Sequence, residues 1–152
     1  MHPPTDRGMI RLLCLLGLLL VLAAPPLATQ SGARIPPPGS PERHAILEAL
    51  RPPVQRTLGS RVVFHEVEIR VSGSWAFVSA QPRSPAGRRF QAFLQECQCD
   101  DLVYGLLRRV QGRWTLVDSF TGVTDVAYLV WLDRYPDAPR ALYPLPPEVP
   151  GA

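Results

Sequence analysis

The chain has 152 residues, a formal net charge of +3 and no lysine, because all sixteen of its basic residues are arginine. A protein without lysine cannot use a Schiff-base lysine, a phosphate-loop lysine or a lysine general base. Arginines and carboxylates are interspersed, and Arg88-Arg89 and Arg108-Arg109 are isolated pairs rather than parts of a basic stripe with aromatic residues, so we do not expect a nucleic-acid binder.

The first 33 residues have the three parts of a secretory signal peptide. Arg7 and Arg11 form a basic start, an apolar run of about 13 residues (12–24) follows, and small or polar residues continue through Ala33. Spanning a membrane takes about 20 apolar residues, so the run is too short to span comfortably. We expect cleavage between Ala28 and Arg34, with Met1 and Met9 both fitting as the start. The product would be exported to the periplasm or beyond, without stable membrane insertion.

About 120 residues remain after cleavage, which is enough for one domain with a single core. Residues 34–40 form a proline-rich leader that we expect neither to continue a helix nor to join a sheet. Ser40 then predicts a helix start as its N-cap. The apolar residues at helical spacing are Ile46, Leu47, Leu50 and Val54. Because Pro52-Pro53 interrupts the pattern, we predict a helix over about 41–51, then a kink or a short second piece that ends at Gly59.

From Arg61 onward the apolar period changes to two, which indicates strands. We predict four strands, over about 61–71, 75–80, 102–110 and 113–120, joined as two hairpins by turns at 72–74 and 111–112. Trp75 and Trp114 each open a return strand, so we expect both to be mostly buried. The segment 88–101 fits a helical turn or a strand that crosses the sheet. Thr124 or Asp125 is expected to cap a short helix that ends near Arg134.

The order of these elements predicts an α+β fold. An N-terminal helix would pack on a curled, four-stranded antiparallel meander, with a short C-terminal helix, in a single domain over 41–136. Prolines then predict a C-terminal tail, 137–152, without regular structure. This order resembles the cystatin-like and nuclear-transport-factor-2-like architecture. The stretches 46–51, 71–78, 106–109 and 122–126 resemble a group of uncharacterised secreted bacterial proteins, which implies a fold and export but brings no site residue.

Cys97 and Cys99 are the two cysteines left after signal removal. In an oxidising compartment an even pair favours a disulfide. In an extended strand, however, Cα atoms two residues apart lie about 6.5–7 Å from each other, at or beyond the limit for a disulfide. A bent backbone would bring them into range. The alternatives are pairing with another chain, free thiols, and metal or redox chemistry, although a metal would need two further ligands.

His65, Asp118 and Tyr104 are the candidate pocket residues. In nuclear-transport-factor-2-like enzymes, which this order of elements resembles, the sheet and helix enclose a pocket with an Asp–His or Asp–Tyr pair. His65 lies on the predicted apolar face of the first strand, and Asp118 lies on another strand. A lone histidine on such a face is more often a core residue than a base, and aromatic residues at strand spacing are more often core than pocket lining.

We therefore predict an exported, non-enzymatic α+β domain that binds an unknown protein or small ligand, without a cofactor or metal. No Gly-rich phosphate loop, G-x-S-x-G elbow or H-E-x-x-H motif occurs in the sequence. One competing hypothesis is a small-pocket enzyme that uses His65 or Asp118 as its base. Another is a periplasmic thiol- or metal-handling protein built on Cys97 and Cys99.

Overall fold

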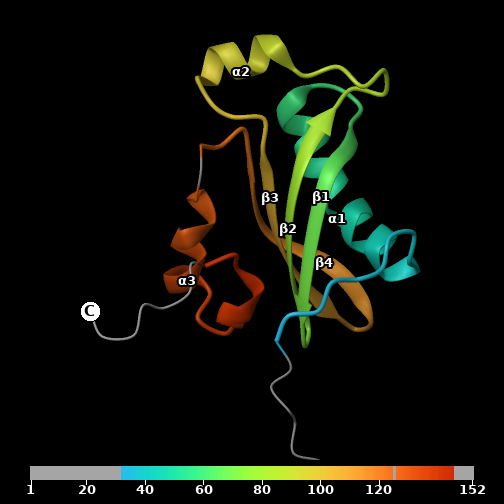
Figure 1. The fold of residues 1–152 in the computed structure, drawn as a ribbon, viewed down its shortest axis with the longest axis vertical. Helices are drawn as coiled ribbons and strands as arrows, with labels where there is room; N and C mark the ends of the chain where they lie inside the picture. The colour runs from blue at the N-terminus through green and yellow to red at the C-terminus, as the bar shows by residue number, and fades with distance from the viewer. Residues whose placement is uncertain (1–31, 125, 146–152) are drawn as a thin grey trace, which may run out of the picture.

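The computed structural model describes residues 32–124 and 126–145. Its helices and strands are, in chain order, α1 (Pro41–Leu58), β1 (Val63–Ser72), β2 (Trp75–Arg83), α2 (Gln91–Cys97), β3 (Val103–Val110), β4 (Arg113–Thr121) and α3 (Val130–Arg134), with 3-10 turns at Ala127–Leu129 and Arg140–Leu142. The four strands form one open antiparallel meander in the order β1-β2-β3-β4 (Figure 1). The predicted fold class is confirmed.

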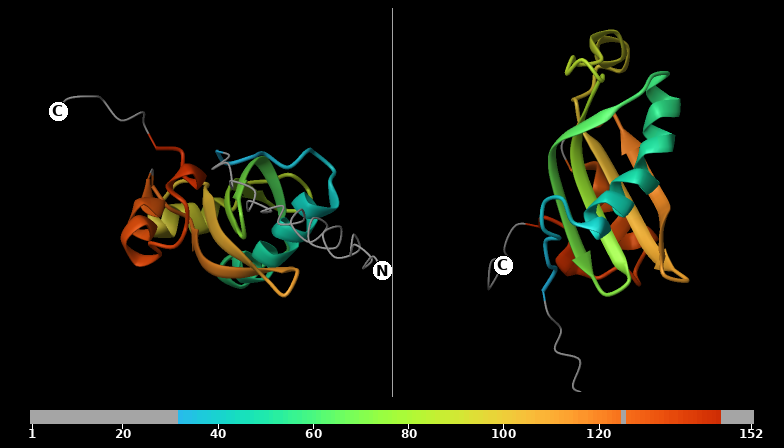
Figure 2. Two further views of the ribbon diagram at one scale, coloured as in Figure 1. Left: turned by 90° about the horizontal axis from the view of Figure 1, so that it is seen from below. Right: turned by 90° about the vertical axis from the view of Figure 1, so that its right-hand side faces the viewer.

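The sheet is the middle of three layers, with α1 on one face and residues 127–145, the C-terminal segment, on the other (Figures 1 and 2). Each face packs on its own core of buried residues, the α1 core and the C-terminal core. Strand β2 shows why, because its side chains are buried on both faces. Ala76 and Val78 face the α1 core, whereas Trp75 and Phe77 face the C-terminal core. A strand covered on both sides is a continuous apolar run instead of an alternating one, as 75–78 is.

Helix α1 begins and ends as the sequence predicts. The side chain of Ser40 accepts a hydrogen bond from the Arg43 backbone N–H at 3.2 Å, and Gly59 takes the left-handed conformation after the last turn. The helix continues through Pro52 and Pro53 and its axis bends near the middle, so the kink, not a separate second piece, is observed (Figure 2). Its buried stripe is Ile46, Leu50 and Val54.

Close contact between α1 and the sheet depends on a glycine in β3. A Cβ atom at Gly105 would lie 2.9 Å from Cδ1 of Leu50, which is buried in the α1 core. Because that is closer than carbon atoms approach without displacement, the missing side chain at 105 sets the distance between helix and strand.

Both flanking segments are more ordered than the sequence suggests. In the leader, Arg34 forms a β-bridge with Val71 through two backbone hydrogen bonds of 2.9 and 2.8 Å, so the expectation that the leader stays apart from the sheet is wrong. Residues 137–145, expected as a tail, pack on the sheet through Ala138, Leu142 and Tyr143. Prolines end helices, but they do not prevent apolar side chains between them from being buried.

Three expectations fall partly or wholly outside the described residues. The signal peptide, the alternative cap at Asp125 and the end of the C-terminal tail lie there, so they stay predictions. The other expected cap, Thr124, is wrong, because the first helical turn, Ala127–Leu129, has Val126 at its N-cap position and no side-chain cap. Within the part of the chain that the structure describes, no helix has the length and apolar character needed to cross a membrane.

Candidate functional site

His65 and Asp118 do not form a common pocket. They lie on β1 and β4, the two edge strands, which are about 14 Å apart for strands spaced by about 4.8 Å. They also differ in register, because Asp118 is level with Leu106, Phe77 and Arg70 across the sheet. His65 itself is exposed. The pairing of β1 with β2 shifts between His65 and Glu68, and Glu66 has a positive φ of 46°. This bulge turns His65 away from the predicted apolar face.

Asp118 connects the sheet with the C-terminal helix. Its Oδ2 atom accepts hydrogen bonds from Trp131 Nε1 at 3.0 Å, the Tyr135 hydroxyl at 3.0 Å and Arg134 at 3.1 Å. Its Oδ1 atom accepts from the Ser119 backbone N–H at 2.8 Å. Burial, followed by the hydrogen bond and the charge of Asp118, raises the pKa of Tyr135. Three donors therefore engage Oδ2 and one engages Oδ1, so this carboxylate acts as a structural acceptor between β4 and the C-terminal helix.

Tyr104 belongs to an aromatic cluster on the same face. It is 7 % exposed and packs against Phe77 and Tyr128, at ring-centroid distances of 5.8 and 5.1 Å. Tyr128 and Tyr143 stack in turn, and Trp131 stacks on Phe120. These rings fill the space between the sheet and the C-terminal segment, which is the arrangement of a core.

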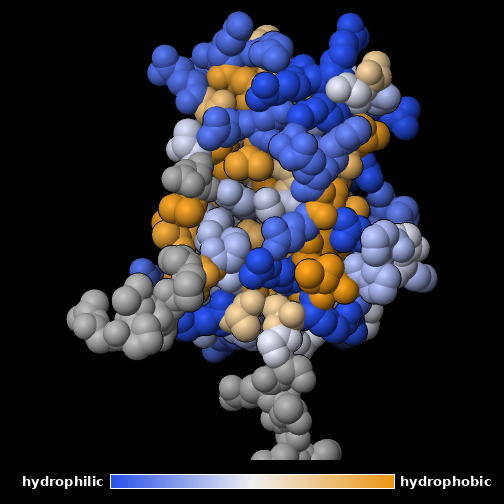
Figure 3. Space-filling model, in the orientation of Figure 1, coloured by the Kyte–Doolittle hydropathy of each residue, from blue (hydrophilic) through white to orange (hydrophobic). Residues whose placement is uncertain are grey.

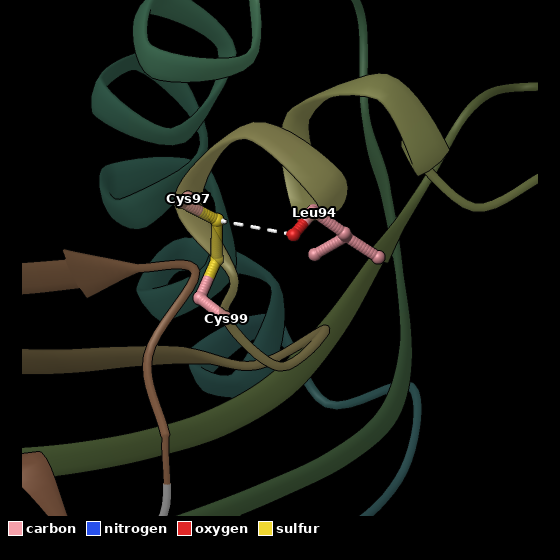
Figure 4. Close-up of a disulfide and its surroundings, with 3 residues drawn as sticks. All are labelled: Leu94, Cys97 and Cys99. Carbon is pink, nitrogen blue, oxygen red and sulfur yellow. Dashed lines mark hydrogen bonds between the residues drawn. A yellow bond between two sulfur atoms is a disulfide. The ribbon is translucent and has the colours of Figure 1, made fainter.

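Cys97 and Cys99 form an intrachain disulfide with a Cα–Cα distance of 5.2 Å (Figure 4). They are not on a strand. Cys97 is the last residue of α2, and Gln98 follows in the left-handed conformation with φ 51° and ψ 41°. This turn shortens the distance that an extended backbone would leave too long, and the Cys99 N–H then donates to the Leu94 carbonyl at 3.3 Å.

The two cysteines differ in environment. Cys97 is exposed, whereas Cys99 is partly buried. Gly122, the residue after strand β4, lies close to Cys99. A Cβ atom added there would lie 2.6 Å from the Cys99 Sγ atom and 2.5 Å from Phe93 Cε1. The disulfide therefore closes a tight turn at the C-terminal end of α2, and this turn lies beside the end of the sheet.

The other end of α2 is held by ion pairs to a buried carboxylate. Asp101 is 7 % exposed, and its Oδ2 atom accepts hydrogen bonds from Arg83 at the end of β2 and from Arg89 Nε at 2.8 Å. Its Oδ1 atom has no hydrogen-bond partner among the described residues. Removing an arginine partner of this carboxylate is costly, because the buried Asp101 would be left with an uncompensated charge.

A groove lies between the C-terminal end of α1 and α2. It has a volume of about 460 Å³ and is lined by Thr57, Phe93, Glu96 and Cys97. The lining combines an aromatic ring and one sulfur of the disulfide with a hydroxyl and a carboxylate. Among the described residues, no group of three or more His, Cys, Asp or Glu side chains could hold a metal ion.

Sequence analysis identified the cysteines but missed Asp101 and the groove. The sequence presents Arg88-Arg89 as an isolated pair, although Arg89 contacts Asp101. The feature that could have located this ion pair is the pairing of β2 with β3. Ala80 lies opposite Val103, so the end of β2 faces the residues that precede β3. That pairing brings Arg83 near Asp101. It was missed because the segment 88–101 was not assigned to helix or strand.

No protein-family model matches the chain, and neither a curated protein nor a solved structure shows significant similarity to it. The functional argument therefore depends on the residues themselves.

Proposed function

We propose that the protein is an exported, non-enzymatic binding module whose partner occupies the groove between α1 and α2. The observation that carries this proposal is the way α2 is held. None of the residues of α2 is buried, so the helix contributes almost nothing to the core. Yet the ion pairs of Asp101 with Arg83 and Arg89 close the segment that carries the helix, and the disulfide fixes the turn at its C-terminal end. Restraint of an exposed element lowers the entropy lost on binding, which favours a preorganised recognition surface.

The groove lining defines the kind of partner. Phe93 offers an apolar surface that is partly buried, and the exposed Glu96 offers a carboxylate at the same wall. Exposed glutamines at 91 and 95 surround them on α2. This combination suits a protein segment that presents an apolar side chain next to an arginine or lysine.

The two competing hypotheses have less support. An enzyme that uses Asp118 as its base would have to release the buried Trp131 N–H from that carboxylate. For a thiol exchanger, Glu96 and Asp100 stand beside the cysteines, and negative charge disfavours a thiolate. The C-terminal end of α2 carries the negative end of the helix dipole at Cys97, which acts in the same direction.

Site-specific photo-crosslinking tests the proposal. A photoreactive residue replaces Glu96 in the groove, and in a matched control it replaces Asp133, an exposed carboxylate on α3. We expect an adduct of defined mass in the exported fraction from position 96 and none from position 133. The partner is then purified, and its Kd is measured against the wild type and Phe93→Ala, whose folding is checked by thermal melting.

A Kd that rises at least about ten-fold in Phe93→Ala, equivalent to about 1.4 kcal/mol, supports the groove as the site. The same adducts from both positions, or an unchanged Kd in a folded Phe93→Ala protein, would contradict it. Export is tested separately by the intact mass of the secreted chain, which should begin between Ala28 and Arg34.

A further inference from the structure

Four arginines, one from the leader and three from the β3–β4 hairpin, lie at the end of the sheet opposite α2. This surface, which we name the hairpin end, comprises Arg34, Arg108, Arg109 and Arg113 together with Ile35 and Val110. The two hairpin turns, at 73–74 and 111–112, and the start of the described chain all lie here (Figure 1). The Arg109 N–H donates to the Ser74 carbonyl at 2.7 Å, which fixes the two turns side by side.

A shared carboxylate holds two of these arginines in position. Glu42, in the first turn of α1, accepts hydrogen bonds from Arg34 at 2.6 and 2.8 Å and from Arg109. These contacts, with the Arg34 hydrogen bond contributing most, lower the pKa of Glu42. One carboxylate against four arginines leaves the hairpin end strongly positive. Arg113 is exposed, and its side chain has no hydrogen bond or ion pair with another described residue.

The aromatic rings at this end are not available to a ligand. The guanidinium of Arg108 lies over Trp75 at 5.1 Å from the ring centroid, and that of Arg109 lies over Trp114 at 4.5 Å. Trp75 is in addition only 7 % exposed. Single-stranded nucleic acids bind by stacking bases on open aromatic faces, and these faces are covered. A guanidinium that lies over a ring keeps its N–H donors at its edge, and such donors are suited to phosphate groups.

Exposed aliphatic side chains accompany the arginines. Ile35 is 66 % exposed and Val110 is 50 % exposed, both unusually high values for branched aliphatic residues. Hydrophobic and hydrophilic residues adjoin over the lower part of the molecule in Figure 3. Arginines beside protruding aliphatic groups are typical of surfaces that bind the interface of an anionic bilayer, where charge attracts the headgroups and the aliphatic groups enter the acyl boundary.

The apolar run of the expected signal peptide, residues 12–24, is joined to the hairpin end by a short stretch of chain. Arg34 lies at this end and follows Ala24, the last residue of that run, by ten residues. Ten residues span at most about 35 Å. Until the signal peptide is cleaved, a run held in the membrane therefore keeps the hairpin end close to the bilayer surface.

We propose that the hairpin end is a docking surface for an anionic lipid bilayer. The domain binds peripherally, with Arg34, Arg108, Arg109 and Arg113 on the headgroup phosphates and with Ile35 and Val110 in the interface. The groove between α1 and α2 lies at the opposite end of the sheet, so it faces away from the membrane and stays open to a partner. The two surfaces are independent, and each can fail without the other.

Vesicle sedimentation tests this proposal with the exported protein. Vesicles of phosphatidylcholine mixed with phosphatidylglycerol are compared with vesicles of phosphatidylcholine alone. We expect binding to the anionic vesicles only. Arg113→Gln should lower the partition coefficient about five-fold, which corresponds to about 1 kcal/mol for one arginine at an anionic surface. Binding should weaken as salt is raised, because a Debye length of about 10 Å at 0.1 M falls to about 3 Å at 1 M.

The matched control is Arg88→Gln, which makes the same change in net charge at the opposite end. Arg88 is exposed and its side chain forms no ion pair with the described residues, so both variants should keep the wild-type melting temperature. Ile35→Ser should lower binding several-fold without any change in charge. Equal losses in Arg88→Gln and Arg113→Gln would show that net charge alone attracts the protein and would overturn the proposal. Binding to single-stranded DNA but not to anionic vesicles would overturn it in favour of a nucleic-acid surface.

Discussion

Replacing Asp118 by alanine tests whether its carboxylate holds the C-terminal helix against the sheet. The change removes the acceptor of the indole N–H of Trp131, which is fully buried, at a cost of about 1–3 kcal/mol. The Tyr135 hydroxyl is half-buried and adds about 1 kcal/mol. The Arg134 side chain is 59 % exposed, so its ion pair adds only about 0.5 kcal/mol. We expect Asp118→Ala to lower the free energy of unfolding by about 3 kcal/mol.

Asp118→Asn is the matched variant, because it keeps the shape and one acceptor oxygen. It should lose about half as much stability, since a single amide oxygen can still accept from Trp131 while the ion pair is gone. Urea unfolding followed by tryptophan fluorescence measures both variants. A loss below about 1 kcal/mol in Asp118→Ala, as for an ordinary surface residue, would refute the structural role.

The same contact makes a prediction about pH. Burial and Asp118 raise the pKa of Tyr135 in the folded protein above its ordinary value of 10.0. A raised pKa contributes stability that is fully present below pH 10.0 and is lost as the pH rises through the folded value. In Asp118→Asn the pKa of Tyr135 should fall toward 10.0, so this alkaline loss should shrink. The stability difference between wild type and Asp118→Asn should therefore narrow above pH 10.0, and a difference that stays constant would contradict the assignment.

Three further substitutions test other parts of the fold. Replacing both Cys97 and Cys99 by serine should leave folding intact and shift the melting temperature by only a few degrees, because so short a loop removes little entropy from the unfolded chain; loss of folding would contradict this. Tyr143 is 2 % exposed, burial raises its pKa to about 12, and its hydroxyl has no hydrogen-bond partner among the described residues. Tyr143→Phe should thus raise the free energy of unfolding by about 1 kcal/mol at neutral pH. It should also remove much of the stability that the wild type loses between pH 10.0 and about 12. A destabilised variant would indicate that the Tyr143 hydroxyl has a hydrogen bond. Gly122→Ala should lower the free energy of unfolding by about 2 kcal/mol, since its φ is 69° and the new Cβ would meet Phe93; a neutral effect in the urea midpoint would show that the α2 end is loosely packed.

The order of the elements could be predicted from the sequence because local signals agree with the tertiary structure. The cap at Ser40, the stop at Gly59 and the Gln111-Gly112 turn, with positive φ at both residues, are all decided within a few residues. The burial of Trp75 was predicted correctly as well. Trp114 is only partly buried, because it lies on the opposite face at the end of the sheet, where the guanidinium of Arg109 covers it.

The candidate site could not be predicted because single residues outside the periodic pattern decide it. The bulge at Glu66 reverses the side on which His65 lies, and no local residue type announces it. The left-handed Gln98 makes a disulfide between Cys97 and Cys99 fit where extended geometry would not. The contact of Arg83 with Asp101 depends on the β2–β3 pairing, which brings together residues that are eighteen positions apart.

The two proposed surfaces follow from which parts of the sheet remain uncovered. The helix α1 covers one face and residues 127–145 cover the other, each over a core of buried residues. The edges are also protected, because Arg34 bridges β1 and both edge strands carry a register shift, at 65–68 in β1 and opposite 106–107 in β4. Such bulges and bridges discourage strand addition by another chain. Within the described residues, the faces and edges of the sheet are thus covered, and its two ends stay open to a partner. One end carries a restrained helix beside a groove, and the other carries arginines beside exposed aliphatic groups. Because these two surfaces lie at opposite ends of the sheet, we expect substitutions in the groove to weaken protein binding only and substitutions at the hairpin end to weaken lipid binding only.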